Sequence, residues 1–462
     1  MNKLKLSIFF LVIVFLSCKK DEIYTTDDFL LTFSTDTVFF DTVFTTIGSA
    51  TQSLIVYNKS NKPVKLKKIK LGKGKSSFFK INIDGISTYE FENYELDRND
   101  SFYIFVQVKI DPTNSNNPIL VLDSIEFHTE KNIYDVKLLA FGQDVIIFRK
   151  KIIENDTVLT SEKPFLIYNY LFVDTHATLT ILPGTKLYFY KDAGLFVLGS
   201  LVAQGTLEKP IIFRHSRLED WYNKVPGQWY GIHILPGSRN NYIDYCIVRN
   251  SIFGIRADSC VTSDYTLVLS NTLLNNISIA GLYFMQSKVK CWNTIIGDCG
   301  YFGIALIIGG YYEFYHCTIL NNWSFNIRKT PTILINNYYK DVNNTYNIRP
   351  LELAYFANCI LYGNLNNEIL LDSFPSQNNF NYFFKNCLVK VSYDISNNSK
   401  WQNIIKNINP EIKNHLKEDY TLKENSICIN NGDPNIGLLF PFDFNKKSRL
   451  ADNKPDIGAF EF

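Results

Sequence analysis

The stretch NTLLNN, residues 271–276, recurs along the middle of the chain with small changes. Close copies are NTIIGD at 293–298, CTILNN at 317–322 and CILYGN at 359–364, and looser copies begin at Cys246 and Cys387. In each copy apolar residues alternate with small or polar ones and a turn residue follows, which indicates one short strand and one corner. Most copies begin 22 to 28 residues after the previous one. A repeat of this length predicts a solenoid, in which each rung buries its core only by stacking on its neighbours.

The first position of the repeat is Cys or Asn in every copy. Cysteine can pack there as a small hydrophobic residue, and asparagine amides can bond from rung to rung. The sequence therefore predicts an inward-facing ladder made of Cys246, Asn271, Asn293, Cys317, Cys359 and Cys387. An even number of cysteines after Cys18 also permits disulfides in an exported protein, although the parallel Cβ vectors of stacked rungs favour buried free thiols.

The composition is that of a globular β-protein. Hydrophobic residues make up 46% of the 462 residues and aromatic residues 15%, with many Asn and Gly turn signals between short apolar runs. Lys and Arg number 47 against 45 Asp and Glu, a net charge of +2. This balance gives no electrostatic reason to expect a nucleic acid as a partner.

The N-terminus resembles a bacterial lipoprotein signal. Lys3 and Lys5 precede an apolar run at residues 6–16, which is too short to span a bilayer, and Ser17 stands before Cys18. The resemblance implies that residues 1–17 are removed and that Cys18 carries lipid, so the chain would be held at a membrane by acyl chains. An ordinary secretory signal with an incidental Cys is the alternative.

The sequence Lys-Lys-Asp-Glu at residues 19–22 resembles the signal that sends lipoproteins of Bacteroidota to the outer face of the outer membrane. We therefore expect an outer-membrane lipoprotein at the cell surface, with a periplasm-facing orientation as the alternative. Residues 18–28 are polar and are predicted to form a tether.

Residues 29–145 predict a β-sandwich. Short apolar strands, for example at 53–57 and 102–108, are separated by turn signals such as Asn-Lys-Ser-Asn at 58–61, and about seven such strands are expected. The stretch resembles the immunoglobulin-like domains that precede catalytic or binding modules in bacterial surface proteins. The lysines between Lys65 and Lys75 are interpreted as a solvated strand face.

From about residue 146 to 405 the strands and corners are those of the solenoid, as in LTILPGTKLYF at 179–189 and GLFVLGSLVAQG at 194–205. Together with the repeats, they resemble the right-handed parallel β-helix proteins of the pectate-lyase-like superfamily, and this resemblance implies the handedness. Residues 217–258 are similar to the opening coils of β-helix lipoproteins of Bacteroidota. The predicted fold class is thus all-β, with an immunoglobulin-like sandwich followed by a parallel β-helix.

The C-terminal stretches CINNGDP at 428–434 and DIGAFE at 456–461 resemble the closing segment of choice-of-anchor Q proteins. Asn430 stands where Asp is usual, which puts a family role for the acidic residues in doubt. Every solenoid needs its open end covered, so residues 406–462 are predicted to cap the last rung.

No catalytic motif stands out. The known enzymes of the β-helix superfamily are mostly polysaccharide lyases and glycosidases, which need clustered carboxylates. The solenoid here has sparse acidic residues and no Gly-His-Gly motif, and Ile327-Arg328-Lys329 is only a faint match to a basic motif of that superfamily. There is no Cys-x-x-Cys and the six histidines are scattered, so no metal or cofactor is predicted.

The best candidate binding surface is the loop between Phe213 and Trp229. An exposed aromatic platform beside arginine and carboxylate groups suits sugars or acidic glycans. The candidate ligand-binding residues are Arg214, His215, Arg217, Asp220, Trp221, Tyr222 and Trp229, with Glu219 beside them. In the alternative interpretation the loop folds back, Arg217 pairs with Asp220, and Trp221 and Trp229 lie in the core.

Three hypotheses for function follow. The favoured one is a surface-anchored, non-catalytic protein whose β-helix binds glycan or another envelope component. The alternatives are a polysaccharide lyase or glycoside hydrolase with an unrecognised site, and a structural spacer without a specific ligand. The oligomeric state is left open.

Overall fold

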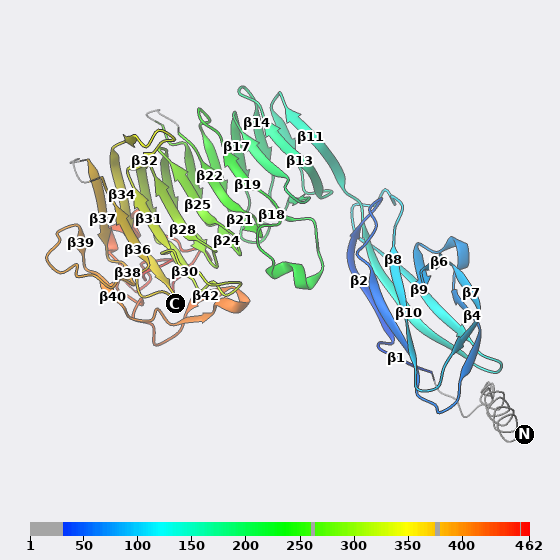
Figure 1. Ribbon diagram of the computed structural model, residues 1–462. Coiled ribbons are helices and arrows are strands. Elements are labelled where there is room, and N and C mark those ends of the chain that lie inside the picture. The colour runs from blue at the N-terminus through cyan, green and yellow to red at the C-terminus, as the bar shows by residue number, and fades with distance from the viewer. Residues whose placement is uncertain (1–30, 260–263, 375–378, 453) are drawn as a thin grey trace, which may run out of the picture. The chain divides into compact units, whose positions relative to one another are not determined.

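The computed structural model describes residues 31–259, 264–374, 379–452 and 454–462. The predicted signal peptide, Cys18 and the predicted tether lie outside the described residues. The chain forms two compact units, of which the first ends at Asp144 and the second begins at Val145. Figure 1 shows the two units, and almost all of their regular structure is β-strand.

The first unit is a sandwich of two five-stranded sheets. One sheet has the order β1 (Leu31–Phe33), β3 (Gln52–Asn58), β8 (Ser101–Val108), β5 (Phe79–Ile83) and β6 (Ile86–Thr88). The other has the order β2 (Thr37–Phe44), β10 (Ile133–Gln143), β9 (Ile119–His128), β4 (Val64–Leu71) and β7 (Glu90–Leu96). The short helix η1 (Gly74–Ser76) follows β4.

The burial pattern along β4, which alternates on either side of a one-residue shift at Lys67, shows why these residues form a sandwich strand. Val64, Leu66 and Ile69 are buried between the sheets, whereas the lysines of the strand face away from the core. Lys68, for example, lies 3.4 Å from Glu90 and 3.2 Å from Glu92 on the neighbouring strand β7. The basic run is therefore a solvated strand face, as predicted.

The second unit is a parallel β-helix whose rungs contribute three columns of strands (Figure 1). The first column holds β15 (Lys186–Phe189), β18 (Ile211–His215), β21 (Cys246–Arg249), β24 (Leu273–Asn275), β27 (Ile295–Ile296), β30 (Thr318–Asn321), β35 (Ile360–Gly363), β38 (Leu388–Val389) and β40 (Ile405–Lys406). The second holds β16 (Gly194–Val197), β19 (Gly231–Ile234), β22 (Phe253–Ala257), β25 (Ala280–Met285), β28 (Phe302–Ile307), β31 (Ile333–Asn336) and β36 (Ile369–Asp372).

The third column is a separate ten-stranded sheet. It holds β12 (Thr157–Leu159), β14 (Thr178–Ile181), β17 (Ser200–Gln204), β20 (Asn241–Asp244), β23 (Leu267–Ser270), β26 (Lys288–Trp292), β29 (Gly310–Tyr315), β34 (Leu351–Ala357), β37 (Phe380–Lys385) and β39 (Trp401–Gln402). The long strands β11 (Ile146–Ile153) and β13 (Phe165–Val173) begin the solenoid, and β13 pairs with both β15 and β16. A hairpin of β32 (Tyr338–Lys340) and β33 (Tyr346–Ile348) projects from it. The predicted fold class is confirmed.

Each copy of the repeated phrase forms a first-column strand together with the corner residues beside it. In the copies that begin at Asn271 and Asn293, the strand register differs by one residue from the predicted alignment. Ile247 pairs with Leu273, Leu273 with Ile295, and Ile295 with Thr318. This pairing aligns Cys246 and Cys317 with Thr272 and Thr294, all of which are buried. The placing of Asn271 and Asn293 in the inward ladder is therefore wrong, because the two copies begin one residue earlier.

Asn271 and Asn293 instead occupy the corner before the strand, with φ of 42° and 49°, as does His316 with φ of 49°. Asparagine tolerates this left-handed conformation better than most residues, which explains its recurrence at the corner. The predicted rung-to-rung amide bonding does occur there, since Asn293 Nδ2 donates to Asn271 Oδ1 over 3.0 Å.

The cysteine part of the ladder is confirmed. Cys317, Cys359 and Cys387 are fully buried in the solenoid core, and Cys317 Sγ lies 3.8 Å from Cys291 Sγ. All seven cysteines in the described part of the chain are buried free thiols. Burial raises the pKa of the Cys246 thiol well above its ordinary value, so this side chain packs as an apolar group.

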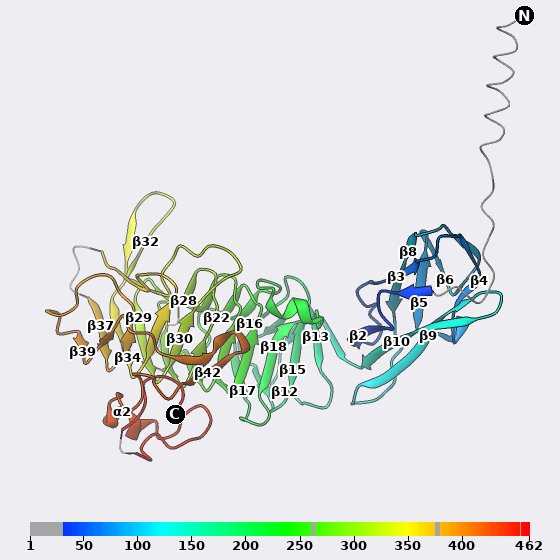
Figure 2. The same cartoon turned by 90° about the horizontal axis from the view of Figure 1, so that it is seen from below.

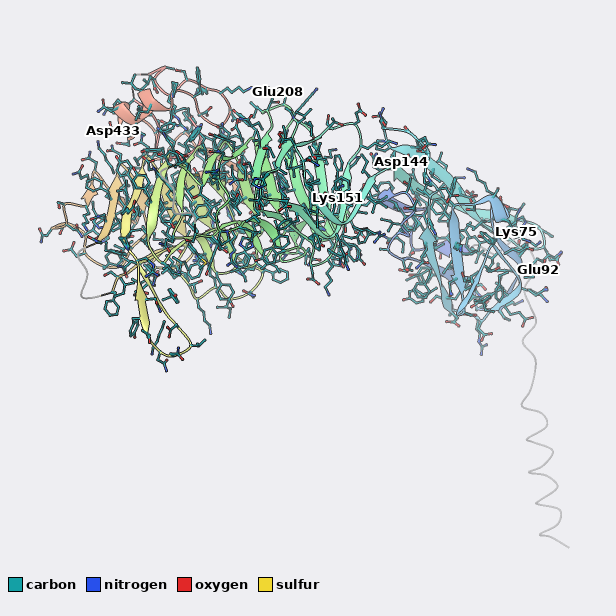
Figure 3. The ribbon with its side chains drawn as sticks, turned by 90° about the horizontal axis from the view of Figure 1, so that it is seen from above. Lys75, Glu92, Asp144, Lys151, Glu208 and Asp433 are labelled. Atoms are coloured by element: carbon teal, nitrogen blue, oxygen red, sulfur yellow. The ribbon has the colours of Figure 1, made fainter. Side chains whose placement is uncertain are left out.

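The C-terminal segment packs along one side of the solenoid and not over its last rung (Figure 2). It contains β41 (Ile412–Asn414), the short helix η3 (His415–Lys417), β42 (Asp419–Leu422) and the helix α2 (Pro434–Leu439). Its residues Tyr420, Ala459 and Phe460 cover Leu273, Ile295 and Leu320, the outward apolar residues of the repeat. Figure 3 shows Glu208 and Asp433 on this same side. Near the last rung, Tyr393 and Ile395 pack against the solenoid core, and the Tyr393 ring contacts Trp401.

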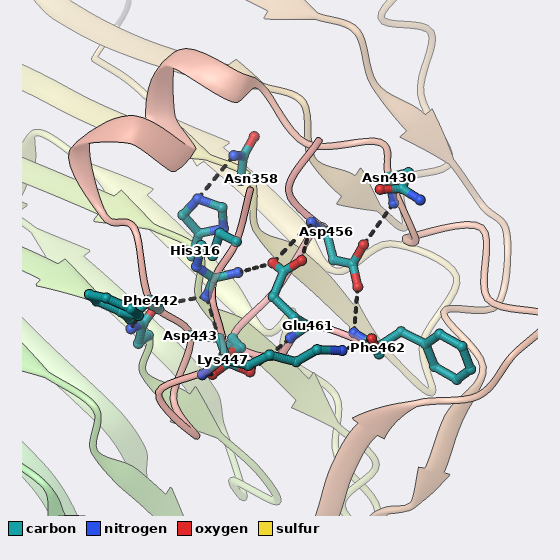
Figure 4. Close-up of polar contacts among 12 residues, drawn as sticks. His316, Asn358, Asn430, Phe442, Asp443, Lys447, Asp456, Glu461 and Phe462 are labelled. Atoms are coloured by element: carbon teal, nitrogen blue, oxygen red, sulfur yellow. Dashed lines mark hydrogen bonds and ion pairs between the residues drawn. The ribbon is translucent and has the colours of Figure 1, made fainter. Parts of the chain in front are cut away.

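A buried polar network holds the segment in place (Figure 4). The guanidinium of Arg449, fully buried, donates to Asn293 Oδ1 over 2.8 Å and to Glu461 Oε1 over 2.6 Å. Asp456 accepts from the backbone N–H of Asn430 and Phe462, each over 2.7 Å. Burial raises the pKa of Glu461 to about 7. These acidic residues of the closing motif therefore serve to dock the C-terminus.

Candidate ligand-binding cleft

The corner between the first and second columns carries the two longest insertions near the middle of the solenoid. Residues 216–230 connect β18 to β19, and residues 322–332 connect β30 to β31. The corners between them are short, with Asn276 after β24 and Asp298 after β27. The two long loops therefore stand on either side of the short corners that contain Asn276 and Asp298.

These short corners form the floor of a cleft of about 390 Å³. The first loop contributes Asn223 and Lys224, and the second loop contributes Ser324 and Phe325 beside Trp323. The C-terminal hairpin, formed by β41, η3 and β42, makes a third wall. The remaining lining residues are Asn275, Asn276, Asp298, His415, Leu416 and Glu418.

The first wall is fixed by amide hydrogen bonds. Asn250 Nδ2 donates to the carbonyl oxygens of Asn223 and Val225 over 2.8 and 3.0 Å. Arg214 Nη2 donates to Asn223 Oδ1 over 2.7 Å. Asn276 Nδ2 reaches the carbonyl oxygen of Asn223 from the next rung over 3.4 Å. The loop is thus held against the rungs beneath it and presents a preformed edge to the cleft.

The opposite wall carries an exposed aromatic ring. Trp323 is buried, and its indole N–H donates to Asn326 Oδ1 over 2.8 Å. Phe325 lies against it with a ring separation of 5.9 Å and is 61% exposed. A ring that is anchored on one edge and open on its face can pack on an apolar ligand surface.

Two carboxyl groups of different character line the cleft. Glu418 Oε1 accepts from Asn275 Nδ2 over 2.8 Å, and Oε2 pairs with Arg249. Burial raises the pKa of Asp298, although His415 acts in the opposite direction. The cleft therefore offers one charge-paired carboxylate and one carboxyl group that holds its proton more readily.

Two of the predicted binding residues lie in the core. Trp229 is fully buried, stacks on Phe189 at 4.1 Å, and donates its indole N–H to the Arg249 carbonyl oxygen over 2.7 Å. His215 is also buried, and its Nδ1 accepts from the backbone N–H of Arg217 over 3.1 Å. Burial and the nearby Arg214 lower the pKa of His215 to about 3, so the ring is neutral at physiological pH. Neither side chain faces solvent.

The other predicted residues do cluster at the surface. Arg217 forms a bidentate pair with Glu219, with Nη2 to Oε1 at 2.9 Å, so the predicted pairing with Asp220 is wrong. The Arg217 guanidinium lies 4.0 Å from the centre of the Tyr222 ring. Trp221 packs on Tyr222 with a ring separation of 3.7 Å and is 64% exposed, so it does not lie in the core. Asp220 is exposed and begins the short helix η2 (Asp220–Lys224), whose last residues reach the cleft.

The sequence reasoning missed the cleft itself. Asn276 and Asp298 are the last residues of two copies of the repeat, and this shared position is a signal that could have placed them on one corner. No local pattern marks Phe325, His415 or Glu418, because the second loop and the C-terminal hairpin meet the corner only in the folded chain. Arg328 of the faint basic motif is fully buried against Glu368 and does not reach a ligand.

A second polar cluster lies on the second column. Asp258 accepts from His233 Nε2 over 2.7 Å and from Arg256 Nε over 2.8 Å. Burial alone would raise the pKa of Asp258, but these two hydrogen bonds lower it. Arg256 and Asp258 thus form an ion pair, to which His233 adds a hydrogen bond, and the three groups are engaged with one another.

Across the described ranges, no group of three His, Cys, Asp or Glu side chains is placed to hold a metal ion. The described helices also include none that is long and apolar enough to cross a membrane.

No protein-family model matches the sequence, and no curated protein matches it. Among solved structures, a family 123 glycoside hydrolase from Clostridium perfringens aligns with 28% of this chain and 30% of its own, at 8% identity and a TM-score of 0.20. The catalytic domain of a family 87 α-1,3-glucanase aligns over 81% of this chain and 90% of its own, at 9% identity and a TM-score of 0.20. A PapD-like domain of human CEP192 aligns over 28% of this chain and 94% of its own, at 10% identity and a TM-score of 0.18.

The chain thus spans less than a third of the family 123 hydrolase. With TM-scores this low, none of the three alignments supports an inference about activity. The strand pairing itself defines an all-β chain with a parallel β-helix.

Proposed function

We propose that this chain is a lipid-anchored outer-membrane protein that binds glycan in the cleft between residues 223–224 and 323–325. The observation that carries the proposal is the lining of that cleft, which combines an open aromatic ring with amide, carboxyl and imidazole groups. The resemblance of the N-terminus to lipoproteins of Bacteroidota supports the anchor at Cys18.

The chemistry of the lining suits sugars. Pyranose rings have apolar C–H faces that pack on aromatic rings, and hydroxyl groups that pair with amides and carboxylates. Phe325 supplies the ring, and Asn223, Asn276 and Glu418 supply polar groups from three separate segments. The exposed Trp221 beside Tyr222 would extend the surface for a longer chain, with Arg217 available to an acidic sugar.

Replacing Phe325 by Ala is expected to weaken glycan binding by about tenfold or more, because packing on an aromatic face contributes about 1–3 kcal/mol. A glycan array with the mature protein would select the ligand, and titration calorimetry would measure the affinity of each variant. Tyr339→Ala is the matched control, since Tyr339 is an exposed aromatic residue on the projecting hairpin. Equal loss in both variants, or none in Phe325→Ala, would contradict the proposal. Trp221→Ala tests the extension separately.

One observation favours the enzymatic alternative. Asp298 and Glu418 line the same cleft, and their surroundings differ in the way that separates an acid from an ionised carboxylate in glycosidases. Release of reducing ends or of unsaturated uronates from any bound polysaccharide, lost in Asp298→Asn, would establish a hydrolase or lyase. A protein that binds glycan without such release is the binding protein proposed above, and one that does neither is the spacer.

Replacing Cys18 by Ser is expected to abolish acylation and to move the protein from the membrane fraction to the soluble fraction. Metabolic labelling with palmitate and cell fractionation measure the two effects. Replacing Asp21 and Glu22 by Ala should keep the acylation but remove the protein from the surface, as judged by added protease on intact cells. An unlabelled wild-type protein would refute the anchor, and unchanged protease accessibility would refute the export signal.

A further inference from the structure

An apolar stretch at residues 438–442, made of the last two residues of α2 and the loop that follows, is exposed on the C-terminal segment. Its sequence is LLFPF, and Leu438, Leu439 and Phe442 are 66%, 66% and 56% exposed. Exposed single hydrophobic residues are ordinary, but a consecutive run of them is costly in water unless it has a function. We call this segment the terminal apolar loop.

The loop lines one side of an open cavity of about 620 Å³ against the third column of the solenoid. Trp292 and Tyr245 line the solenoid side, and Leu439, Phe440 and Phe442 line the loop side. The Phe440 ring lies 5.5 Å from Trp292 and 4.7 Å from Tyr315, which fixes the base of the loop. The walls of the cavity are thus mainly aromatic and aliphatic.

The polar groups of this cavity are already engaged with the protein. Asn271 Nδ2 donates to Asp244 Oδ1 over 2.8 Å, and Asn293 bonds to Asn271 and to the Phe442 carbonyl oxygen. Asp443 is buried and accepts from the backbone N–H of Lys447 and Glu461. Because most of the lining is aromatic or aliphatic and its polar groups are hydrogen-bonded to the protein, the cavity suits an apolar chain.

Three lysines lie near the loop or its cavity. Lys290 Nζ lies 5.5 Å from the centre of the Phe440 ring, and Lys446 lines the cavity. Lys447 is exposed and contacts the carbonyl oxygen of Phe462. Three acidic groups lie nearby. Glu208 is 3.4 Å from Lys446, and both members of this pair are exposed and therefore weakly coupled. Glu313, opposite Lys290 on the neighbouring strand, accepts from the Tyr315 hydroxyl, and Asp443 is buried. Exposed apolar side chains with lysines beside them match acyl chains beneath anionic headgroups.

We propose that the terminal apolar loop and the cavity behind it bind the surface of an anionic bilayer. Leu438, Leu439 and Phe442 enter the acyl region, and the three lysines meet lipid phosphates. This contact is separate from glycan binding and does not depend on acylation of Cys18, although an anchored chain would meet the bilayer at a high local concentration.

The test uses residues 19–462, which contain every described element of both compact units. Vesicles of phosphatidylethanolamine and phosphatidylglycerol at a ratio of about 3:1 are compared with phosphatidylcholine vesicles in a sedimentation assay. We expect binding to the anionic vesicles that weakens in high salt, and a loss of about tenfold or more in the double variant Leu439→Asp/Phe442→Asp. Val342→Asp is the matched control, because Val342 is 98% exposed on the projecting hairpin.

Both variants alter exposed side chains, so their thermal unfolding and their glycan binding should equal those of the wild type. Three results would overturn the proposal: no binding to anionic vesicles, binding that the double variant retains, or binding that Val342→Asp loses equally. A concentration-dependent dimer that the double variant abolishes, in a protein that ignores vesicles, would identify a second copy of the chain as the occupant instead.

Discussion

Replacing Arg328 by Ala is expected to lower the free energy of unfolding of the solenoid by about 3–5 kcal/mol. Arg328 and Glu368 are fully buried, and two hydrogen bonds of 2.8 and 2.6 Å join the guanidinium to the carboxylate. Arg328 also donates to the Thr330 carbonyl oxygen over 2.6 Å. Without the arginine, Glu368 would keep only the hydrogen bonds from Thr332 and the backbone of Leu365, and its charge would be buried without a cation.

Guanidinium chloride unfolding followed by circular dichroism measures this change. Lys329→Ala, which alters an exposed neighbour, should change the free energy of unfolding by about 0.5 kcal/mol or less. The double variant Arg328→Met/Glu368→Leu should lose less than Arg328→Ala, because no unpaired charge remains. If Arg328→Ala unfolds like Lys329→Ala, the buried ion pair does not stabilise the second loop of the cleft.

Replacing Trp229 by Ala is expected to cost about 3–5 kcal/mol of folding free energy. The ring is fully buried against Phe189, and its removal leaves a cavity and an unpaired carbonyl oxygen at Arg249. Trp221→Ala, eight residues earlier in the same loop, should change the free energy by about 0.5 kcal/mol or less because Trp221 is mostly exposed. Denaturant unfolding of the two variants separates the structural tryptophan from the surface one. Equal destabilisation by both would contradict the placement of the loop.

The repeat was enough to predict the solenoid because its period, its turn residues and its apolar alternation all follow from local geometry. The register of Asn271 and Asn293 could not be read in the same way. A corner asparagine and an inward cysteine can each begin a copy of the phrase, and only the pairings of Ile247 with Leu273 and of Ile295 with Thr318 separate them.

The repeat also carries two adjacent apolar residues, such as Leu273 and Leu274, and only the folded chain shows why both are apolar. Leu274 faces the solenoid core, whereas Leu273 is covered by the C-terminal segment. That contact joins residues far apart in sequence, so the pattern could predict a buried position but not its partner. The cleft escaped prediction for the same reason, since His415 and Glu418 reach it from the end of the chain.

The return of the C-terminal segment along the side changes how this solenoid should unfold. Stacked rungs ordinarily behave as a one-dimensional array that frays from its ends. Here Glu418 forms an ion pair with Arg249, and hydrogen bonds join Arg449 to Asn293 and Asn431 to Asn386. The C-terminal segment therefore connects rungs from β21 to β38. We expect these rungs to melt together as one cooperative block. A chain that stops short of Phe460 would keep Tyr420 but lose a large part of the apolar cover over Leu273 and Ile295, so we expect its rungs to lose this cooperativity.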